Sequence, residues 1–301
     1  MNRIYIITIS VLMSAVAYGQ QQVMFTQYMF NQMAINPAYT GIHEGISTSF
    51  LWREQWLGFE GAPRTQTASI HAPISFRPIS LGMLIMRDQI GITTQNSVNF
   101  DYAYRIRIGN TRLSFGLQAS FNFYKADYNQ DALLDPILAN ANVNVTRPNF
   151  GSGIMWHSDK FYLGLSVPQL INQKFDPKNP DSDSELIRHY FLSGGYVFGI
   201  HENLLIKPNF LLKRVEGAPV QADLNVNVLL QNTVWVGVSY RSFESLAALV
   251  QLQLGPKMQI GYGFDFLTLT DLSSIQSGSH EIMLNYIIQM PRTKILTPRY
   301  F

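Results

Sequence analysis

The stretch Arg112–Tyr124, with the sequence RLSFGLQASFNFY, alternates apolar and polar residues along its whole length. Successive side chains of a strand point to opposite faces, whereas helical spacing would scatter these apolar residues around the axis. The stretch therefore predicts a strand with one apolar face and one face of small polar residues. The apolar positions are Leu113, Phe115, Leu117, Ala119, Phe121 and Phe123.

The same alternation recurs elsewhere, most clearly in 95–108, 220–230 and 258–266. These segments are longer than ordinary strands and match the ~9–11 residues that a tilted strand needs to cross a bilayer. Their polar face is rich in Gly, Ser, Asn and Gln, which suits an enclosed polar lumen better than an open aqueous surface. The expected fold class is all-β: a single transmembrane antiparallel β-barrel of the outer-membrane type.

Counting the alternating segments predicts fourteen strands, an even number, as a bacterial single-chain barrel requires. The long connections, at 54–63, 125–148, 168–187 and 268–278, all follow odd-numbered strands. Outer-membrane barrels have short periplasmic turns and longer outer loops, so both termini are expected on the periplasmic side. The expected strands are 45–53, 64–73, 80–88, 94–108, 111–124, 149–157, 160–167, 188–198, 203–214, 220–230, 233–241, 246–255, 257–267 and 279–289.

The composition of the 301-residue chain agrees with a membrane barrel and excludes several other classes. Charged residues make up only 14%, against about 25% in typical domains, and 47% are hydrophobic, which excludes a disordered polar chain. The 22 basic and 20 acidic residues give a net charge of +2 without a basic stripe, so nucleic acid is not an expected partner. Cysteine is absent, which excludes disulfides.

The first residues have the pattern of an export signal. Arg3 precedes the apolar run Ile4–Met13, and small residues follow up to Gly19. The run is about half as long as the ~20 residues of a spanning helix, which favours a signal peptide over a membrane anchor. Residues 1–19 are therefore predicted to be removed.

The mature chain is expected to comprise an N-terminal segment (20–44), the barrel (45–289) and a periplasmic C-terminal tail (290–301). The N-terminal segment is rich in apolar residues but does not alternate apolar and polar positions as the strands do, so we expect it to be buried outside the barrel wall's ladder. This buried place is a plug in the lumen or a periplasmic docking site; the alternative is a coil that packs on the barrel wall and serves stability alone. Pro291 separates the tail from the last strand, because proline lacks the ladder donor. The final Phe301 resembles the assembly signal of outer-membrane proteins.

Three separated motifs resemble one known family. The stretch Phe25–Gly41, FTQYMFNQMAINPAYTG, is similar to the opening F-S-Q-Y-M-F-N-x-x-x-I-N-P-A-Y-A-G of the PorP/SprF family, outer-membrane proteins of the type IX secretion system of Bacteroidetes. Thr26 and Thr40 replace the Ser and Ala of that pattern. Arg53–Thr65 resembles the family's R-x-Q-W-x-G-x-x-G-A-P-x-T, and Gly278–Tyr286 is a third match near the end.

The resemblance implies a non-enzymatic component of the type IX secretion or gliding machinery, embedded in outer-membrane lipid. Family members look like partners of the periplasmic secretion ring, of a peptidoglycan-associated periplasmic protein, or of a large surface adhesin that they help to export and anchor. The motif residues with an implied plug or partner-docking role are Phe25, Gln27, Tyr28, Phe30, Asn31, Asn36, Pro37, Tyr39 and Gly41. The motif residues expected at the first outer loop are Arg53, Trp56, Gly58, Gly61 and Pro63.

A set of charged residues is expected to line the lumen. Because buried charges need partners, Arg–Asp pairs across the lumen are one interpretation, and a selectivity lining for a channel is the other. These residues are Arg53 at the end of the first strand, Asp101, Arg105, Arg107, Arg112, Asp223, Arg241 and Asp265.

No chemistry of catalysis emerges from the sequence. The six histidines do not have metal-ligand spacing, and no nucleophile or nucleotide-binding motif is present. We therefore expect neither enzymatic activity nor a cofactor. Periodicity and composition fit a secretion component and also an outer-membrane porin or a transporter of small hydrophobic solutes; only the family motifs favour the first.

Overall fold

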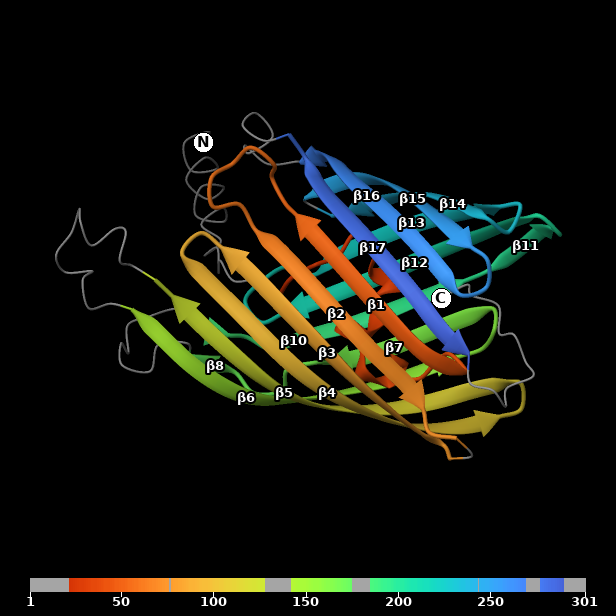
Figure 1. Cartoon of the computed structure of the whole chain (residues 1–301), viewed down its shortest axis with the longest axis horizontal. Coiled ribbons are helices and arrows are strands. Elements are labelled where there is room, and N and C mark those ends of the chain that lie inside the picture. The colour runs from red at the N-terminus through yellow and green to blue at the C-terminus, as the bar shows by residue number, and fades with distance from the viewer. Residues whose placement is uncertain are drawn as a thin grey trace, which may run out of the picture.

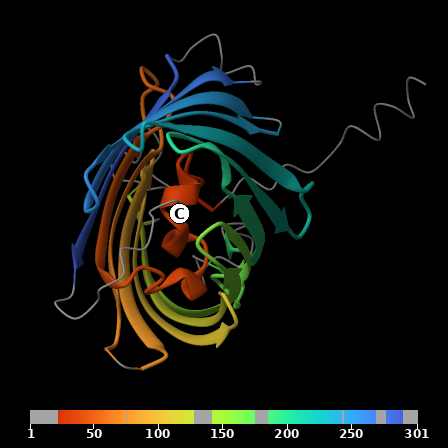
Figure 2. The same ribbon diagram turned by 90° about the vertical axis from the view of Figure 1, so that its right-hand side faces the viewer.

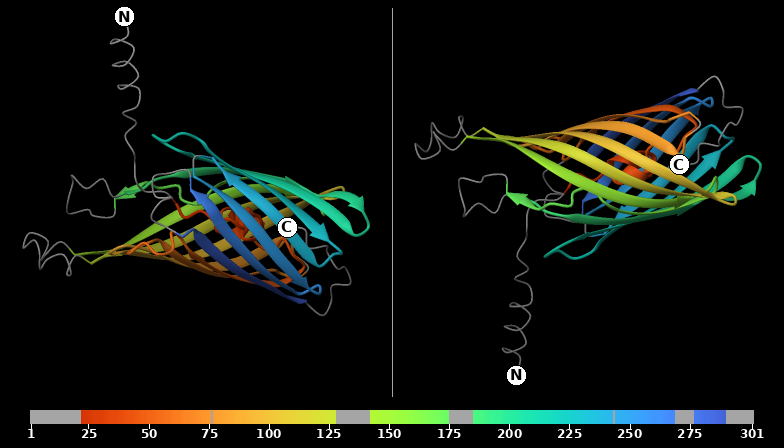
Figure 3. Two further views of the ribbon diagram at one scale, coloured as in Figure 1. Left: turned by 90° about the horizontal axis from the view of Figure 1, so that it is seen from above. Right: turned by 90° about the horizontal axis from the view of Figure 1, so that it is seen from below.

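The computed structural model of the chain describes residues 22–75, 77–127, 142–174, 185–242, 244–268 and 277–289. It is a closed antiparallel β-barrel whose strands run obliquely around the wall (Figure 1, Figure 3). The strands of the wall are β1 (Gly45–Glu54), β2 (Arg64–Pro73), β3 (Ile79–Ile90), β4 (Thr93–Ile108), β5 (Thr111–Ala126), β6 (Val143–His157), β7 (Phe161–Val167), β10 (His189–Tyr196), β11 (Phe198–His201), β12 (Leu204–Val215), β13 (Gln221–Leu230), β14 (Val234–Arg241), β15 (Ser245–Leu254), β16 (Met258–Thr268) and β17 (Ser279–Gln289).

Each strand pairs with its neighbour in sequence, and the first strand closes the wall against the last. The β1–β17 seam runs in register from Gly45 opposite Gln289 to Glu54 opposite His280. β10 and β11 both pair with β12 and are separated only at Val197, so they act as one strand. The barrel therefore has fourteen strand positions, as predicted. A separate small hairpin joins β8 (Gln173–Lys174) to β9 (Glu185–Leu186).

The largest difference from the expected strand boundaries is at β6, which begins at Val143 rather than at 149. Pro148 lies inside this strand and pairs with Phe121 of β5. A proline lacks the N–H that donates to a sheet ladder, which weakens the sequence signal for a strand at this point. The pairing of β6 with β7 starts only at Ser152, so Pro148 lies where the β6–β7 ladder is missing.

The two faces of the wall have opposite chemistry, as the alternation predicts. Large apolar side chains point outward and are exposed, among them Phe100, Leu117 and Val238. Small polar side chains such as Ser114 and Asn122 point inward and are buried. An outward apolar band around a polar interior is the pattern of a bilayer-spanning barrel. In the part of the chain that the structure describes, no helix is long and apolar enough to span a membrane.

The two ends of the barrel differ in their connections. The long-loop end carries the connections that follow β1, β5, β7 and β16, and the short-turn end carries those that follow β2, β4, β6, β11, β13 and β15. Tight turns at the short-turn end use positive φ at Gly109 and at Gln231 and Asn232.

Residues 22–44, here called the lumen segment, lie inside the barrel (Figure 2). They form three short 3-10 turns, η1 (Tyr28–Phe30), η2 (Gln32–Ala34) and η3 (Pro37–Tyr39). The segment enters at the long-loop end, where the Gln22 N–H donates to Nε2 of His189 at 3.3 Å, and reaches β1 at the short-turn end.

The first and last described residues therefore lie at opposite ends of the barrel. Gln22 is at the long-loop end, whereas Gln289 pairs with Gly45 at the short-turn end. The prediction that both termini share the periplasmic side concerns 1–21 and 290–301, which lie outside the described residues, as do the predicted signal peptide and Phe301.

Candidate functional site

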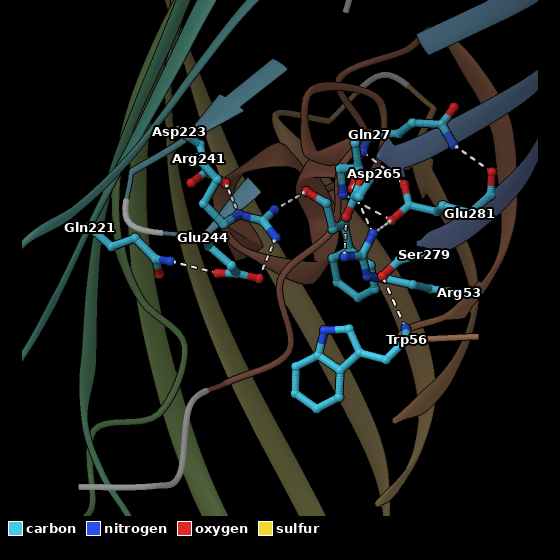
Figure 4. A network of polar contacts seen from close by, with 12 residues as sticks. Gln27, Arg53, Trp56, Gln221, Asp223, Arg241, Glu244, Asp265, Ser279 and Glu281 are labelled. Carbon is cyan, nitrogen blue, oxygen red and sulfur yellow. Dashed lines mark hydrogen bonds and ion pairs between the residues drawn. The ribbon is translucent and has the colours of Figure 1, made fainter. Parts of the chain in front are cut away.

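Arg53 anchors the start of the lumen segment to the barrel wall (Figure 4). Its guanidinium lies 2.6 Å from a carboxylate oxygen of Asp265 and 3.2 Å from one of Glu281. A third N–H···O contact, 2.6 Å long, joins Arg53 to the Thr26 hydroxyl of the segment. The three charged side chains come from β1, β16 and β17 and are almost completely buried, so each depends on the others for solvation.

The carboxylate of Glu281 also holds the backbone of the segment. Its two oxygens accept hydrogen bonds from the N–H groups of Thr26, at 2.9 Å, and of Gln27, at 2.8 Å. The Thr26 hydroxyl donates to Asp265 at 2.7 Å. Charge-assisted bonds of this kind are stronger than neutral ones, so this end of the segment is fixed to the wall by its main chain and not only by packing.

A second arginine, Arg241 on β14, binds the segment from a nearby part of the wall (Figure 4). Arg241 lies 2.9 Å from Asp223 and 3.3 Å from Glu244, and it donates to the backbone oxygen of Phe25 at 3.3 Å. Burial opposes ionisation of Glu244, but the Arg241 guanidinium outweighs this effect and holds the pKa of Glu244 below its ordinary value. Gln221 donates to the same carboxylate at 2.8 Å.

The middle of the segment packs as a hydrophobic core inside the lumen. Phe30 meets Trp235 edge-on, with ring centroids 6.2 Å apart, and Nζ of Lys207 lies 4.4 Å from the Phe30 centroid. The other members of this core are Met24, Phe25, Tyr28, Met29, Ile35, Leu51, Phe191, Leu211, Leu229, Leu249 and Met283.

The Asn36–Pro37 turn fixes the far half of the segment. The Asn36 side chain accepts from the N–H of Ala38 at 2.9 Å and donates to the Ile154 carbonyl at 3.2 Å. Further along, the N–H of Gly41 donates to Nδ1 of His71 at 2.9 Å. The asparagine thus caps η3 and binds the wall at once, which explains why this turn lies within the motif.

Glycines on the inner face of the wall make room for the segment. A Cβ added at Gly116 would collide with the backbone of Pro37 and Ala38, and one added at Gly153 would collide with the Asn36 amide. Gly261 lies against Gln27 in the same way. The alternation places these glycines on the polar lumen face, but which of them lie opposite the segment follows only from the strand register.

The structure brings most of the predicted site residues together. All nine motif residues between Phe25 and Gly41 are buried in the lumen. Asp223, Arg241 and Asp265 belong to the anchoring network, whereas Asp101 is buried elsewhere on β4. The remaining predicted lumen charges, Arg105, Arg107 and Arg112, lie at the short-turn end.

Two differences from the predicted residues concern the lumen charges. Arg53, which ends the first predicted strand and borders the first outer loop, lies in β1 and points into the lumen. Arg107 lies on the inward-facing register but is exposed, because β4 extends to the rim there. Glu244 and Glu281 were missing from the predicted lumen charges although both belong to the network; Glu281 lies in the third family motif, which was the available signal.

The first outer loop, 55–63, is folded onto its neighbours rather than extended. The N–H of Trp56 donates to the Ser279 hydroxyl at 3.2 Å (Figure 4), and Leu57 exchanges backbone bonds with 277–278. Gly58 and Gly61 both adopt positive φ, which favours glycine. Pro63 is buried at the base of the loop.

Two cavities border the segment. One, lined by Phe30, Met33, Ser69 and other side chains, has a volume of about 30 Å³. The other, lined by Gln22, Val23, Met86 and other side chains near the long-loop end, has a volume of about 60 Å³. Within the described residues, no group of three His, Cys, Asp or Glu could hold a metal ion. What the site does chemically is to hold a chain segment across the lumen.

Comparison with known proteins gives one family and several distant barrels. The family described as type IX secretion system membrane protein PorP/SprF matches residues 17–286. No curated protein matches the chain.

Three of the similar solved structures are distant outer-membrane barrels and channels. The CymD monoaromatic hydrocarbon channel has a TM-score of 0.48 and 11% identity, covering 87% of this chain and 93% of its own. An outer membrane protein of Acinetobacter baumannii has a TM-score of 0.47 and 9% identity, covering 81% and 99%. A Pseudomonas aeruginosa FadL homologue has a TM-score of 0.46 and 13% identity, covering 91% and 96%. At this level of similarity we draw no functional conclusion from them.

Proposed function

The chain belongs to the PorP/SprF family of type IX secretion system membrane proteins, and we propose that it serves that system as a non-enzymatic barrel scaffold in the outer membrane. In this role it docks periplasmic secretion-ring or peptidoglycan-associated proteins, and it helps to export and anchor a surface adhesin. The alternative is an open porin or a transporter of small hydrophobic solutes.

The filled lumen is the observation that favours a scaffold over a pore. The segment 22–44 is bonded to the wall at Arg53 on β1, at Arg241 on β14 and, through the Asn36 side chain, at the Ile154 carbonyl on β6. Removing a partner from a buried ion pair costs about 3–5 kcal/mol, because it leaves a charge without solvation. A solute path through the described part of the lumen would require these contacts to break.

The two ends of the barrel suggest where partners bind. In outer-membrane barrels short turns face the periplasm and long loops face outward. On that orientation the short-turn end would meet ring or peptidoglycan-associated proteins, and the long-loop end would meet the adhesin. Leu57 and Phe59 are exposed on the first outer loop, beyond the strands, and are suited to an apolar contact there.

The test is affinity purification of the tagged protein from its native envelope in mild detergent, with mass spectrometry and conductance in planar bilayers. Near-stoichiometric recovery of ring subunits or of one large adhesin, together with low conductance, would support the scaffold. Recovery of the barrel alone, with steady open-channel conductance, would overturn it in favour of the porin. We expect an Arg53→Ala variant to conduct more than the wild type, because it loses the contact that holds Thr26 of the lumen segment to the wall.

A further inference from the structure

Four arginines surround one pocket at the short-turn end of the barrel. Arg77 comes from the β2–β3 turn, Arg105 and Arg107 from β4, and Arg112 from the start of β5. The pocket has a volume of about 130 Å³ and is completed by Pro73, Pro78 and Ser80. It lies at the mouth of the barrel, close to where the lumen segment leaves the interior.

The positive charge of the pocket is largely uncompensated. Arg112 pairs with Glu44 at 3.3 Å, and no acidic side chain lines the pocket in the described part of the chain. Four arginines and this one carboxylate give a formal charge of 4 − 1 = +3. Arg107 and Arg112 also lie directly opposite each other across the β4–β5 ladder. Like charges in that position are destabilising, so the arrangement favours an anion that bridges them.

The arginines are positioned by contacts that leave donors available. Arg105 donates from Nε to the Ser114 hydroxyl at 3.2 Å and from Nη2 to the Thr40 carbonyl at 3.3 Å. Arg107 donates from Nε to the carbonyl of Gly109 at 3.2 Å. A guanidinium carries five N–H donors, so each of these side chains is held in place while further N–H groups can face the pocket.

We propose that this pocket binds a phosphate group, either inorganic phosphate or a phosphate monoester. The planar fork of arginine matches phosphate oxygens two at a time. A phosphate monoester carries about −1.5 to −2 charges at pH 7, which offsets an excess of +3 better than one carboxylate does. Because Arg105 also holds Thr40, the bound anion couples this end of the lumen segment to the wall. This site is independent of the proposed role in secretion.

The test compares the purified wild-type protein with the double variant Arg77→Gln, Arg107→Gln. Both arginines are exposed, so the barrel is expected to fold without them. Titration calorimetry with inorganic phosphate at constant ionic strength measures the free anion. Co-sedimentation with phosphatidylcholine vesicles, with and without phosphatidic acid, measures a lipid headgroup. The matched control is Arg87→Gln, an exposed arginine near the other end of β3.

We expect saturable phosphate binding that the double variant weakens by about tenfold or more and that Arg87→Gln leaves unchanged. Binding in the calorimeter identifies a soluble anion, and binding only to the phosphatidic acid vesicles identifies a lipid source. An affinity that is equal in wild type and double variant, or the absence of saturable binding in both arms, overturns the site. Heat-modified mobility on gels confirms that each variant is a folded barrel.

Discussion

At the scale of single residues, Arg53 is the side chain on which the filled lumen most depends. Substituting Arg53 by Ala leaves the carboxylates of Asp265 and Glu281 buried without their cation. We expect a loss of about 3–5 kcal/mol, seen as a lower midpoint of denaturant or thermal unfolding in detergent. The matched control is Arg64→Ala: Arg64 pairs with Glu54 at 2.9 Å but is 57% exposed, so we expect a loss below about 1 kcal/mol. Similar losses in the two variants would contradict the anchoring role.

Glu244 is expected to make the stability of the folded barrel fall as the solution is acidified. Its pKa in the folded protein is below the ordinary value of 4.5, so its contact with Arg241 stabilises the fold above that value. The contribution is lost as the pH falls below 4.5 through the lower folded pKa. Unfolding of Glu244→Gln, followed between neutral pH and that acidic range, should show a smaller loss of stability on acidification than the wild type. A wild-type slope in the variant would contradict this assignment.

Gly116 tests whether the wall is shaped for the segment. Gly116→Val places a side chain where the backbone of Pro37 and Ala38 lies, so we expect a displaced segment and higher conductance in planar bilayers. Gly199→Val is the matched control, because a Cβ there meets only Leu205 at 3.7 Å, an ordinary contact. Unchanged conductance in Gly116→Val, with the barrel folded, would show that the lumen stays closed by other means.

Residues at this scale were predictable from the sequence where alternation settled the face, as for Asp223, Arg241 and Asp265. The partners of Asp265 were not, because Arg53 is 212 and Thr26 is 239 positions away along the chain. Pairing of that kind follows from barrel closure and is not encoded in local spacing.

At the scale of elements, the first outer loop exposes a small apolar surface while its backbone is held by hydrogen bonds. Leu57 and Phe59 are 43% and 44% exposed, while the backbone of the loop is bonded to 277–278 and to Gly91. If this surface binds a partner, Leu57→Asp with Phe59→Asp should lower partner recovery about tenfold without changing barrel stability. Glu60→Gln, an exposed change in the same loop, is the control. Unchanged partner recovery would show that Leu57 and Phe59 do not contribute to partner binding.

The strands were predictable because each has a lipid face and a lumen face, and the alternation of apolar and polar residues follows these two faces. The predicted strand boundaries fail where a strand has no paired neighbour on one side or where its hydrogen-bond ladder is interrupted. Pro148 is accommodated in β6 where the ladder to β7 is absent, and Val197 separates β10 from β11. Such local relaxations depend on which strand lies alongside, so they do not appear in the sequence of the strand itself.

At the scale of the whole molecule, the sequence shows a barrel and a family but leaves the place of residues 22–44 open between plug, docking site and wall packing. The structure places these residues inside the lumen, since they have no alternation to join the wall and too much apolar surface for water. The three 3-10 turns are irregular and have no periodic signature, so their path could not have been predicted from spacing alone.

The β1–β17 seam links the closure of the barrel to the lumen segment. The lumen segment precedes the first strand, yet it is bonded to residues of the last two strands. Arg53 lies on one side of this seam and Glu281 on the other, so their ion pair exists only when β1 and β17 are joined. The site that holds Thr26 and Gln27 is therefore complete only in the closed barrel. Closure of the cylinder and retention of the lumen segment are thermodynamically coupled, so a ligand or mutation that opens the seam would also release the segment.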